Sequence, residues 1–86
     1  MATDVVVPES VLKALNALPK EIRIKFWDQL EKLIRNPSHP SLRNEKLAGT
    51  EHWAFSVTMN YRATNVRSSD SIVITAIGTH KEVLGN

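Results

Sequence analysis

The sequence predicts an α+β domain in which an N-terminal strand and a two-helix hairpin pack on a mostly antiparallel β-sheet. Two observations carry this prediction. Apolar residues recur at helical spacing up to about residue 35, and from Trp53 onward they alternate with polar residues, which is the period of a half-buried strand. Asn36-Pro37 separates the two halves, because proline stops a helix. The chain has 86 residues with no linker or internal repeat, so one domain over residues 1–86 is expected.

The first half is predicted to contain one strand and two helices. The β-branched run at residues 4–7 is typical of a strand, and Pro8 ends it. Ser10 is expected to cap a helix that begins near Val11. Pro19 stands where a second helix would begin, since its fixed φ suits the first turn. The expected core-facing positions of both helices are Val11, Leu12, Leu15, Leu18, Ile22, Phe26, Trp27, Leu30, Leu33 and Ile34.

The second half predicts three strands that follow one another as an antiparallel meander. The first runs from Trp53 to a bend near Met59-Asn60, and its inward positions are expected to be Trp53, Phe55, Val57 and Met59. The second covers residues 61–66, and a turn rich in Ser and Asp follows at residues 68–70. Residues 71–77 are apolar on both faces, which predicts the central, fully covered strand, ended by Gly78.

Composition excludes several classes of protein. The absence of cysteine rules out a disulfide framework and a thiolate metal site. The three histidines do not have metal-ligand spacing, so no metal and no other cofactor is expected. No apolar run approaches the roughly 20 residues that cross a bilayer, and no signal-peptide pattern is present. A cytoplasmic protein without a membrane partner is therefore expected.

Charge gives only a weak indication of an anionic partner. The formal net charge is +2, and the basic residues after the helices are interleaved with aromatic ones. The residues concerned are Arg43, Lys46, Arg62 and Arg67, with Trp53, Phe55 and Tyr61 between them. Such a stripe suits nucleic acid, but four cations over this span are often just surface, and charge alone favours an ordinary solvated surface.

The chain contains several short motifs, each of which is weak evidence for a protein family by itself. Their order and spacing together are a more specific signal. The motifs are Leu18-Pro19, the stretch from His39 to Arg43, Lys46-Leu47 with Gly49, Trp53 at a strand start, Asn60-Tyr61-Arg62-Ala63 and Ile77-Gly78-Thr79-His80. In this arrangement the chain resembles the RelE/ParE toxin superfamily of bacterial type II toxin–antitoxin systems. The resemblance covers nearly the whole chain, and the fold it implies agrees with the pattern above.

The resemblance implies a RelE-like endoribonuclease that cuts messenger RNA, usually in the ribosomal A site, without a metal. The 2′-OH attacks the adjacent phosphate, which requires a base, an acid and cations for the developing charge. The resemblance places Arg62 at phosphate or transition-state stabilisation and His80 at general acid or base catalysis, since histidine titrates near neutral pH. The further candidates for RNA binding are Lys46, Tyr61, Arg43 and His52.

Each candidate also has a purely structural interpretation. Arg62 could form an ion pair with Glu51 or Asp70, and His80 could cap the turn at Gly78. The hydroxyl of Tyr61 could bond within the core, which is the commoner state of a buried tyrosine. The remaining candidates could be solvated surface residues, and both tryptophans could belong to the core.

Two departures from the family pattern keep other functions open. Ala54 and Ser56 stand where some RelE-type relatives carry lysines, and residues 81–84 offer no aromatic side chain to stack on a base. The alternatives are a ParE-like toxin that inhibits DNA gyrase without catalysis, and a degenerate member that only binds its antitoxin. All three imply a small antitoxin as partner, bound by strand addition or by a helix in a groove. Messenger RNA and the ribosome are partners of the nuclease alone, and the oligomeric state stays open.

Overall fold

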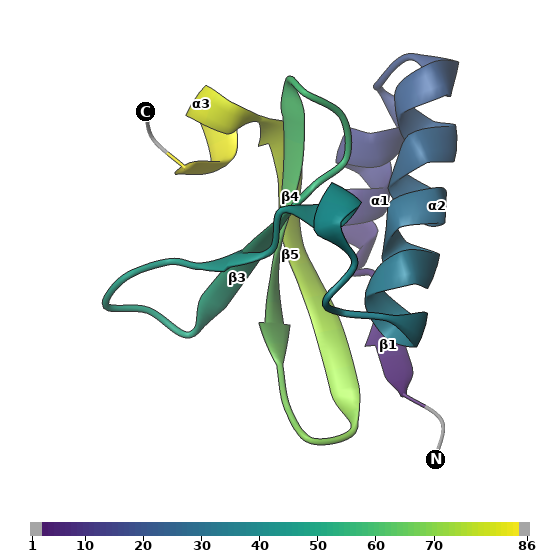
Figure 1. Cartoon of the computed structure of the whole chain (residues 1–86). Helices are drawn as coiled ribbons and strands as arrows, with labels where there is room; N and C mark the ends of the chain where they lie inside the picture. The colour runs from purple at the N-terminus through teal and green to yellow at the C-terminus, as the bar shows by residue number, and fades with distance from the viewer. Residues whose placement is uncertain (1–2, 85–86) are drawn as a thin grey trace.

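A five-stranded mixed sheet with two helices on one face forms the centre of the molecule in a computed structural model that describes residues 3–84 (Figure 1). The elements in chain order are β1 (Asp4–Val6), α1 (Glu9–Asn16), α2 (Lys20–Arg35), the 3-10 turn η1 (Pro40–Leu42), β2 (Glu45–Lys46), β3 (His52–Ser56), β4 (Tyr61–Arg67), β5 (Ser71–Thr79) and α3 (His80–Leu84). The predicted α+β fold, with an N-terminal strand and a helical hairpin on a largely antiparallel sheet, is confirmed.

The strands lie in the order β1-β5-β4-β3-β2. Strands β2 to β5 pair antiparallel, as expected of a meander, while β1 pairs parallel with β5. The sequence left the partner of the first strand open, and the structure assigns it to the last one. As a result β1 and β2 are the two edges of the sheet.

The core lies between the helices and the sheet face that they cover. Val11 and Leu15 of α1 and Phe26 of α2 are fully buried there, and Phe26 lies 6.2 Å from Phe55 of β3 between ring centroids. Other core residues are Leu30, Leu33, Leu42, Val57, Ala63, Ile72 and Ile74. Burial of this continuous apolar set fixes the helical layer on the sheet.

The start of α1 differs from the prediction. The helix begins at Glu9, directly after Pro8, and the Pro8 carbonyl accepts the N–H groups of Val11 and Leu12 at 3.0 Å. Ser10 therefore lies inside the first turn and was wrongly expected to be the cap. The fixed φ of proline already provides the extended residue that precedes a helix, so no side-chain cap is needed. Pro19 precedes α2 in the same way, and Asn36 ends it as predicted.

Three predicted core residues prove to be exposed. Trp27 and Ile34 lie on the outer side of α2, with 46% of the Trp27 surface exposed, although the Trp27 ring still contacts Phe26 edge-on. Met59 is 88% exposed because β3 ends at Ser56 and the chain turns before the predicted alternation is complete. Helical spacing identified the apolar stripe of α2 but overestimated its width.

The last strand is not the central one. The middle position belongs to β4, and β5 lies between β4 and β1. Thr75 of β5 is exposed, so one face of β5 is only partly covered, and the strand continues through Gly78 to Thr79. An irregularity between Thr64 and Asn65 of β4 shifts the register opposite Thr75, which explains why a strict alternation could not be read from the sequence.

The predicted elements did not include η1, β2 or α3. Figure 1 shows α3 on the side of the sheet away from α1 and α2, the side towards which the loop between β2 and β3 also extends. Within residues 3–84, the helices are all too short or too polar to cross a membrane.

Candidate active site

The sheet face away from α1 and α2 is lined by small side chains. Directly paired residues share a face and neighbours along a strand alternate, so the pairs of Ser56 with Arg62 and of Arg62 with Gly78 lie on this open face. Ala54 and Thr64 belong to the same face by the same rule. These small residues are buried and form a floor from which one long side chain, Arg62, rises.

The Arg62 guanidinium is mostly buried and incompletely paired. Its side chain is 14% exposed, and its Nη2 lies 3.8 Å from Oε1 of Glu45 in β2. Its Nη1 is the one buried side-chain nitrogen or oxygen within residues 3–84 without a hydrogen-bond partner. A charged hydrogen bond would be closer to 2.8 Å, so the contact with Glu45 is loose. The guanidinium therefore retains donors for an anion.

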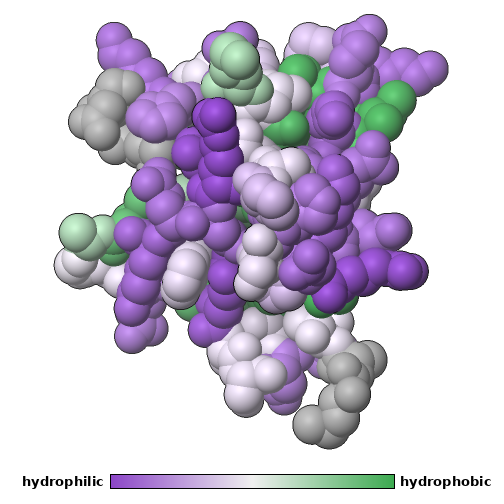
Figure 2. All heavy atoms as spheres, viewed as in Figure 1, coloured by the Kyte–Doolittle hydropathy of each residue, from purple (hydrophilic) through white to green (hydrophobic). Residues whose placement is uncertain are grey.

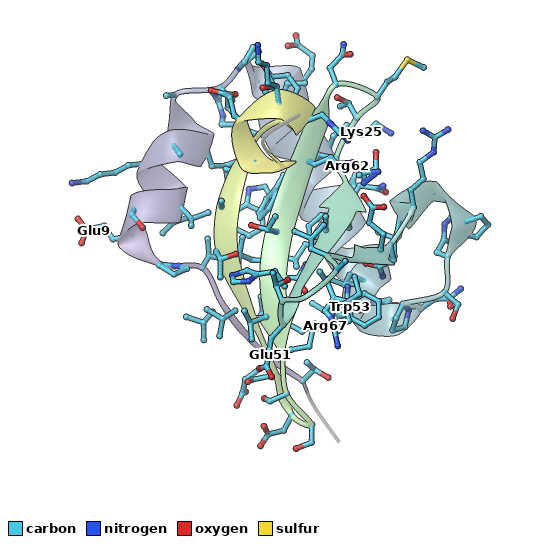
Figure 3. All side chains as sticks on the ribbon, turned by 90° about the vertical axis from the view of Figure 1, so that its left-hand side faces the viewer. Glu9, Lys25, Glu51, Trp53, Arg62 and Arg67 are labelled. Atoms are coloured by element: carbon cyan, nitrogen blue, oxygen red, sulfur yellow. The ribbon has the colours of Figure 1, made fainter. Side chains whose placement is uncertain are left out.

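The alternative prediction that Arg62 pairs with Glu51 or Asp70 was wrong, because its ion pair is with Glu45. Figure 3 shows Glu51 towards the other end of the sheet from Arg62. Asp70 lies in the turn between β4 and β5, also at that end, while Glu45 is half exposed and faces Arg62. Sequence reasoning missed Glu45 because it stands in a two-residue strand that has no period to detect. The signal that could have found it is its place beside Lys46 within a family motif.

A hollow of about 640 Å³ opens between the loop after β2 and helix α3. Glu45, Lys46 and Thr50 line it from the loop side, and His80 and Val83 line it from α3. The predicted residues His80 and Lys46 thus share a hollow with the carboxylate that contacts Arg62. This set of Glu45, Lys46, Arg62 and His80 is called the open-face site below.

Helix α3 holds His80 at this hollow. The His80 backbone N–H donates to the Asn60 carbonyl at 3.2 Å, so the first residue of α3 is tied to the turn before β4. The Thr79 hydroxyl accepts the Glu82 N–H at 3.2 Å, and the Glu82 carboxylate accepts the Thr79 N–H at 2.8 Å. This reciprocal pair is a capping box. The hydrogen bond from the Thr79 backbone, followed by that from its side chain, lowers the pKa of Glu82 below 4.5.

Gly78 lets α3 fold back closely over the sheet. A Cβ at this position would lie 3.0 Å from Glu82 Oε1 and 3.3 Å from Glu82 Cβ. Gly78 therefore allows α3 to pack closely on the sheet. It does not end β5, which continues to Thr79. His80 does not cap a turn at Gly78; its side chain is exposed at the hollow.

The other predicted RNA-binding residues lie elsewhere. Tyr61 is half buried and packs against the core, on the face opposite to Arg62. His52 shares the open face but pairs with Val66, four residues along β4 from Arg62, or about 13 Å. Arg43 is exposed beside η1 and lines a different hollow, between α2 and the end of β3.

Arg67 has a structural role that explains part of the basic stripe. Its guanidinium lies 4.4 Å from the ring centroid of Trp53, and Figure 3 shows the two side chains together. It also donates to the side-chain oxygens of Asn65 and Asn44. Burial lowers the pKa of Arg67. Trp53 is half buried beneath this cation, so these two residues fasten the segment before β2 to the sheet.

No cluster of three or more His, Asp or Glu side chains suited to a metal ion occurs in the described part of the chain, residues 3–84.

Comparisons with known proteins identify the fold. No protein-family model and no curated protein sequence matches the chain. Solved structures do match. The RelE of an archaeal RelE–RelB complex from Pyrococcus horikoshii is 24% identical with a TM-score of 0.77, over 92% of this chain and 96% of that one. YafQ from the E. coli DinJ–YafQ toxin–antitoxin complex is 15% identical with a TM-score of 0.80, over 99% and 100%.

A free E. coli RelE toxin variant is 17% identical with a TM-score of 0.75, over 98% of this chain and 90% of that one. At these identities the likeness shows the fold. The expected resemblance is therefore confirmed at that level: this chain has the fold of the RelE-type toxins of toxin–antitoxin systems.

Proposed function

We propose that this chain is the toxin of a type II toxin–antitoxin pair and that it cleaves messenger RNA without a metal. The observation that carries the proposal is the open-face site on a RelE-type fold, where a carboxylate and an imidazole line one hollow and the carboxylate contacts an incompletely paired guanidinium. These three groups supply the base, the cation and the acid that transesterification of a phosphodiester requires.

The reaction assigns one role to each group. The Glu45 carboxylate takes the proton of the 2′-OH, whose oxygen then attacks the adjacent phosphorus. A P–O2′ bond forms and the P–O5′ bond breaks, while protonated His80 gives its proton to the departing 5′-oxygen. The products are a 2′,3′-cyclic phosphate and a 5′-hydroxyl end. Atoms and charge balance without a further reactant.

Arg62 stabilises the charge that develops on the phosphoryl oxygens. Its free Nη1 and its loosely held Nη2 can both turn to a phosphate, since a guanidinium binds such oxygens in pairs. When the phosphate takes over Nη2, Glu45 is released from the ion pair and becomes free to accept a proton. Lys46 lines the same hollow and contributes a second positive charge there.

The antitoxin is proposed to bind the opposite side of the molecule and the exposed sheet edge. Ile24, Trp27 and Ile34 are exposed and lie on one side of α2. Strand β1 is an edge strand whose Val6 is also exposed. An apolar helix face and an open strand edge suit a helix in a groove and strand addition respectively. In the view of Figure 2 the side on which the helices lie is mostly polar, with a few small apolar areas among the polar side chains.

Inducible expression in bacteria tests the nuclease. The chain should arrest growth, and primer extension on a defined transcript should reveal cleavage. Arg62→Ala, Glu45→Gln and His80→Ala should each lower the cleavage rate of the purified protein by about 100- to 1000-fold. Glu51→Gln, an exposed carboxylate outside the open-face site, is the matched control and should cleave normally.

The same experiment separates the alternative functions. Growth arrest that persists undiminished in the triple variant Glu45→Gln/Arg62→Ala/His80→Ala would refute the catalytic roles. Intact transcripts together with induced DNA damage would select a gyrase inhibitor instead. Absence of growth arrest from the folded, expressed protein would select a member that only binds its antitoxin.

A further inference from the structure

A second hollow, of about 390 Å³, lies between α2, η1 and the end of β3. Three cations line it: Lys25 and Lys32 from α2, and Arg43 from the residue after η1. None of its lining residues is acidic, and none of the three cations forms an ion pair with a carboxylate among residues 3–84. This group of Lys25, Lys32 and Arg43 is called the basic hollow below.

The floor of the basic hollow is rigid and polar. Gln29 is buried there, and its Nε2 donates to the carbonyls of Ser41 at 3.1 Å and Ser56 at 2.8 Å. Its Oε1 accepts a hydrogen bond from Lys32 Nζ at 3.2 Å. The amide thereby joins α2, η1 and β3, and fixes the spacing of the elements that carry the three cations.

Arg43 occupies a conformation that other residues would adopt more readily. Its φ is 47° and its ψ 43°, in the left-handed region that favours glycine or asparagine. The chain places an arginine at this position and leaves the side chain exposed at the hollow. The left-handed conformation ends η1, because the Arg43 N–H donates to the Pro40 carbonyl at 3.2 Å, and it sets where the arginine side chain leaves the turn.

The basic hollow is a direct neighbour of the open-face site. Ser56 lines the hollow and is the cross-strand partner of Arg62. Strand β2 pairs β3 only at Trp53 and Ala54, so the outer edge of β3 beside Ser56 is free of strand pairing. Figure 3 shows Lys25 and Arg62 at the same end of the sheet. The basic hollow and the open-face site are therefore adjacent at the end of β3.

From this arrangement we propose that the basic hollow binds the phosphate backbone of the single-stranded RNA whose scissile phosphate lies at Arg62. The inference rests on the proposed function and extends it: the hollow holds phosphates that flank the cut and so orients the strand. Unpaired cations without an aromatic stacking partner suit a sugar–phosphate backbone and not bases, so the contact is independent of sequence.

The test measures binding of an uncleavable strand. A fluorescent 2′-O-methyl RNA oligonucleotide of about a dozen nucleotides is titrated by anisotropy at several salt concentrations. Each phosphate contact on a single strand contributes about 0.7 to the slope of log K against log salt. Lys25→Gln/Arg43→Gln should lower this slope by about 1.4, and adding Lys32→Gln should lower it by about 2.

Lys13→Gln/Lys20→Gln removes two exposed lysines outside the hollow and should leave the slope unchanged. The double variant Lys25→Gln/Arg43→Gln changes exposed residues only, so its circular dichroism should match that of the original protein even if Lys32→Gln disturbs Gln29. An unchanged slope in the double variant overturns the proposal, as does an equal loss in the control. Lost affinity for the antitoxin with unchanged RNA binding overturns it too and assigns an acidic protein segment to the hollow.

Because the probe lacks a 2′-OH, this measurement does not depend on catalysis. If Lys25→Gln/Arg43→Gln weakens RNA binding but the original protein cleaves no transcript, the proposed nuclease is refuted. The proposed binding site is then retained. Normal cleavage by the Glu51→Gln control together with an unchanged slope in the double variant would refute the binding site alone.

Discussion

Arg62 lowers the stability of the folded protein, and a role in binding an anion would explain why it is there. A buried guanidinium with one free nitrogen and one loose ion pair is poorly compensated for its lost hydration. Nothing in the core requires a cation there, because its neighbours on the floor are the small residues Ser56 and Gly78. The arrangement is typical of a group kept for an anionic ligand at the expense of stability.

Replacement of Arg62 by an apolar residue of similar length should reveal this cost. Arg62→Met is expected to raise the free energy of unfolding by about 0.5–1 kcal/mol, because it removes an unsatisfied buried donor and keeps the packing of the stem. Urea denaturation of the purified protein measures the change. Cleavage by the same variant should fall to the level of Arg62→Ala. A loss of stability above about 1 kcal/mol would instead indicate that the ion pair with Glu45 is a structural contact.

At the scale of elements, α3 decides whether His80 reaches the open-face site. This helix has only five residues, and it holds its place through the capping box between Thr79 and Glu82 and through contact with β4 and β5. A short helix is marginal by itself, so loss of the box should let it fray. The position of the imidazole then depends on the ionisation of one carboxylate.

The pH dependence of this box follows from the lowered pKa of Glu82. The contribution of the carboxylate to α3 is fully present above its ordinary pKa of 4.5 and is lost as the pH falls through the lower value of the folded state. The amide proton shift of Thr79 should therefore titrate with a midpoint below 4.5. Glu82→Gln is the control, in which this titration should be absent. A midpoint at or above 4.5 would show that the box does not form in solution.

The longer elements and β1 were predicted from the sequence, while η1, β2 and α3 were not. The stripe through Phe26, Leu30 and Leu33 identified α2, and its start was placed correctly from Pro19, whereas the start of α1, predicted near Val11 from a Ser10 cap, lies two residues earlier. Helix α3 and strand β2 have too few residues to show a period, so Glu45 was overlooked and His80 was expected at a strand end. The signal for α3 was the spacing of Thr79 and Glu82 in a capping box.

Arg62 and His80 were predicted from the family motif and not from a pattern of charge, and their roles stay predictions. Both belong to the open-face site. Arg62 contacts Glu45, and His80 lines the hollow that Glu45 also lines. Charge alone grouped Arg67 with them, although that residue packs on Trp53. The basic hollow was missed because its cations come from α2 and from the residue after η1, which only the folded chain brings together.

At the scale of the whole molecule, the two faces of the sheet differ in what covers them and in which side chains they carry. The face under α1 and α2 contains the core, and α2 presents an exposed apolar strip of Ile24, Trp27 and Ile34 to the outside. The other face carries the open-face site, and α3 lies on that side of the sheet (Figure 1). A partner bound on the outer side of α2 would not touch Glu45 or His80 directly. Antitoxin binding and catalysis should therefore be separable by substitution.

Trp27→Ala tests this separation. Truncation of an exposed tryptophan at the centre of an apolar interface commonly costs about 2–4 kcal/mol of binding free energy, or roughly 30- to 1000-fold in Kd. We expect a loss of this size in affinity for the antitoxin encoded beside the toxin, measured by titration calorimetry. RNA cleavage by the variant alone should be unchanged, so the antitoxin should no longer protect cells that express it.

Lys13→Ala, an exposed residue of α1, is the control. Retained affinity in Trp27→Ala would exclude the exposed strip of α2 as the antitoxin's site and favour β1, an edge strand whose Val6 is exposed.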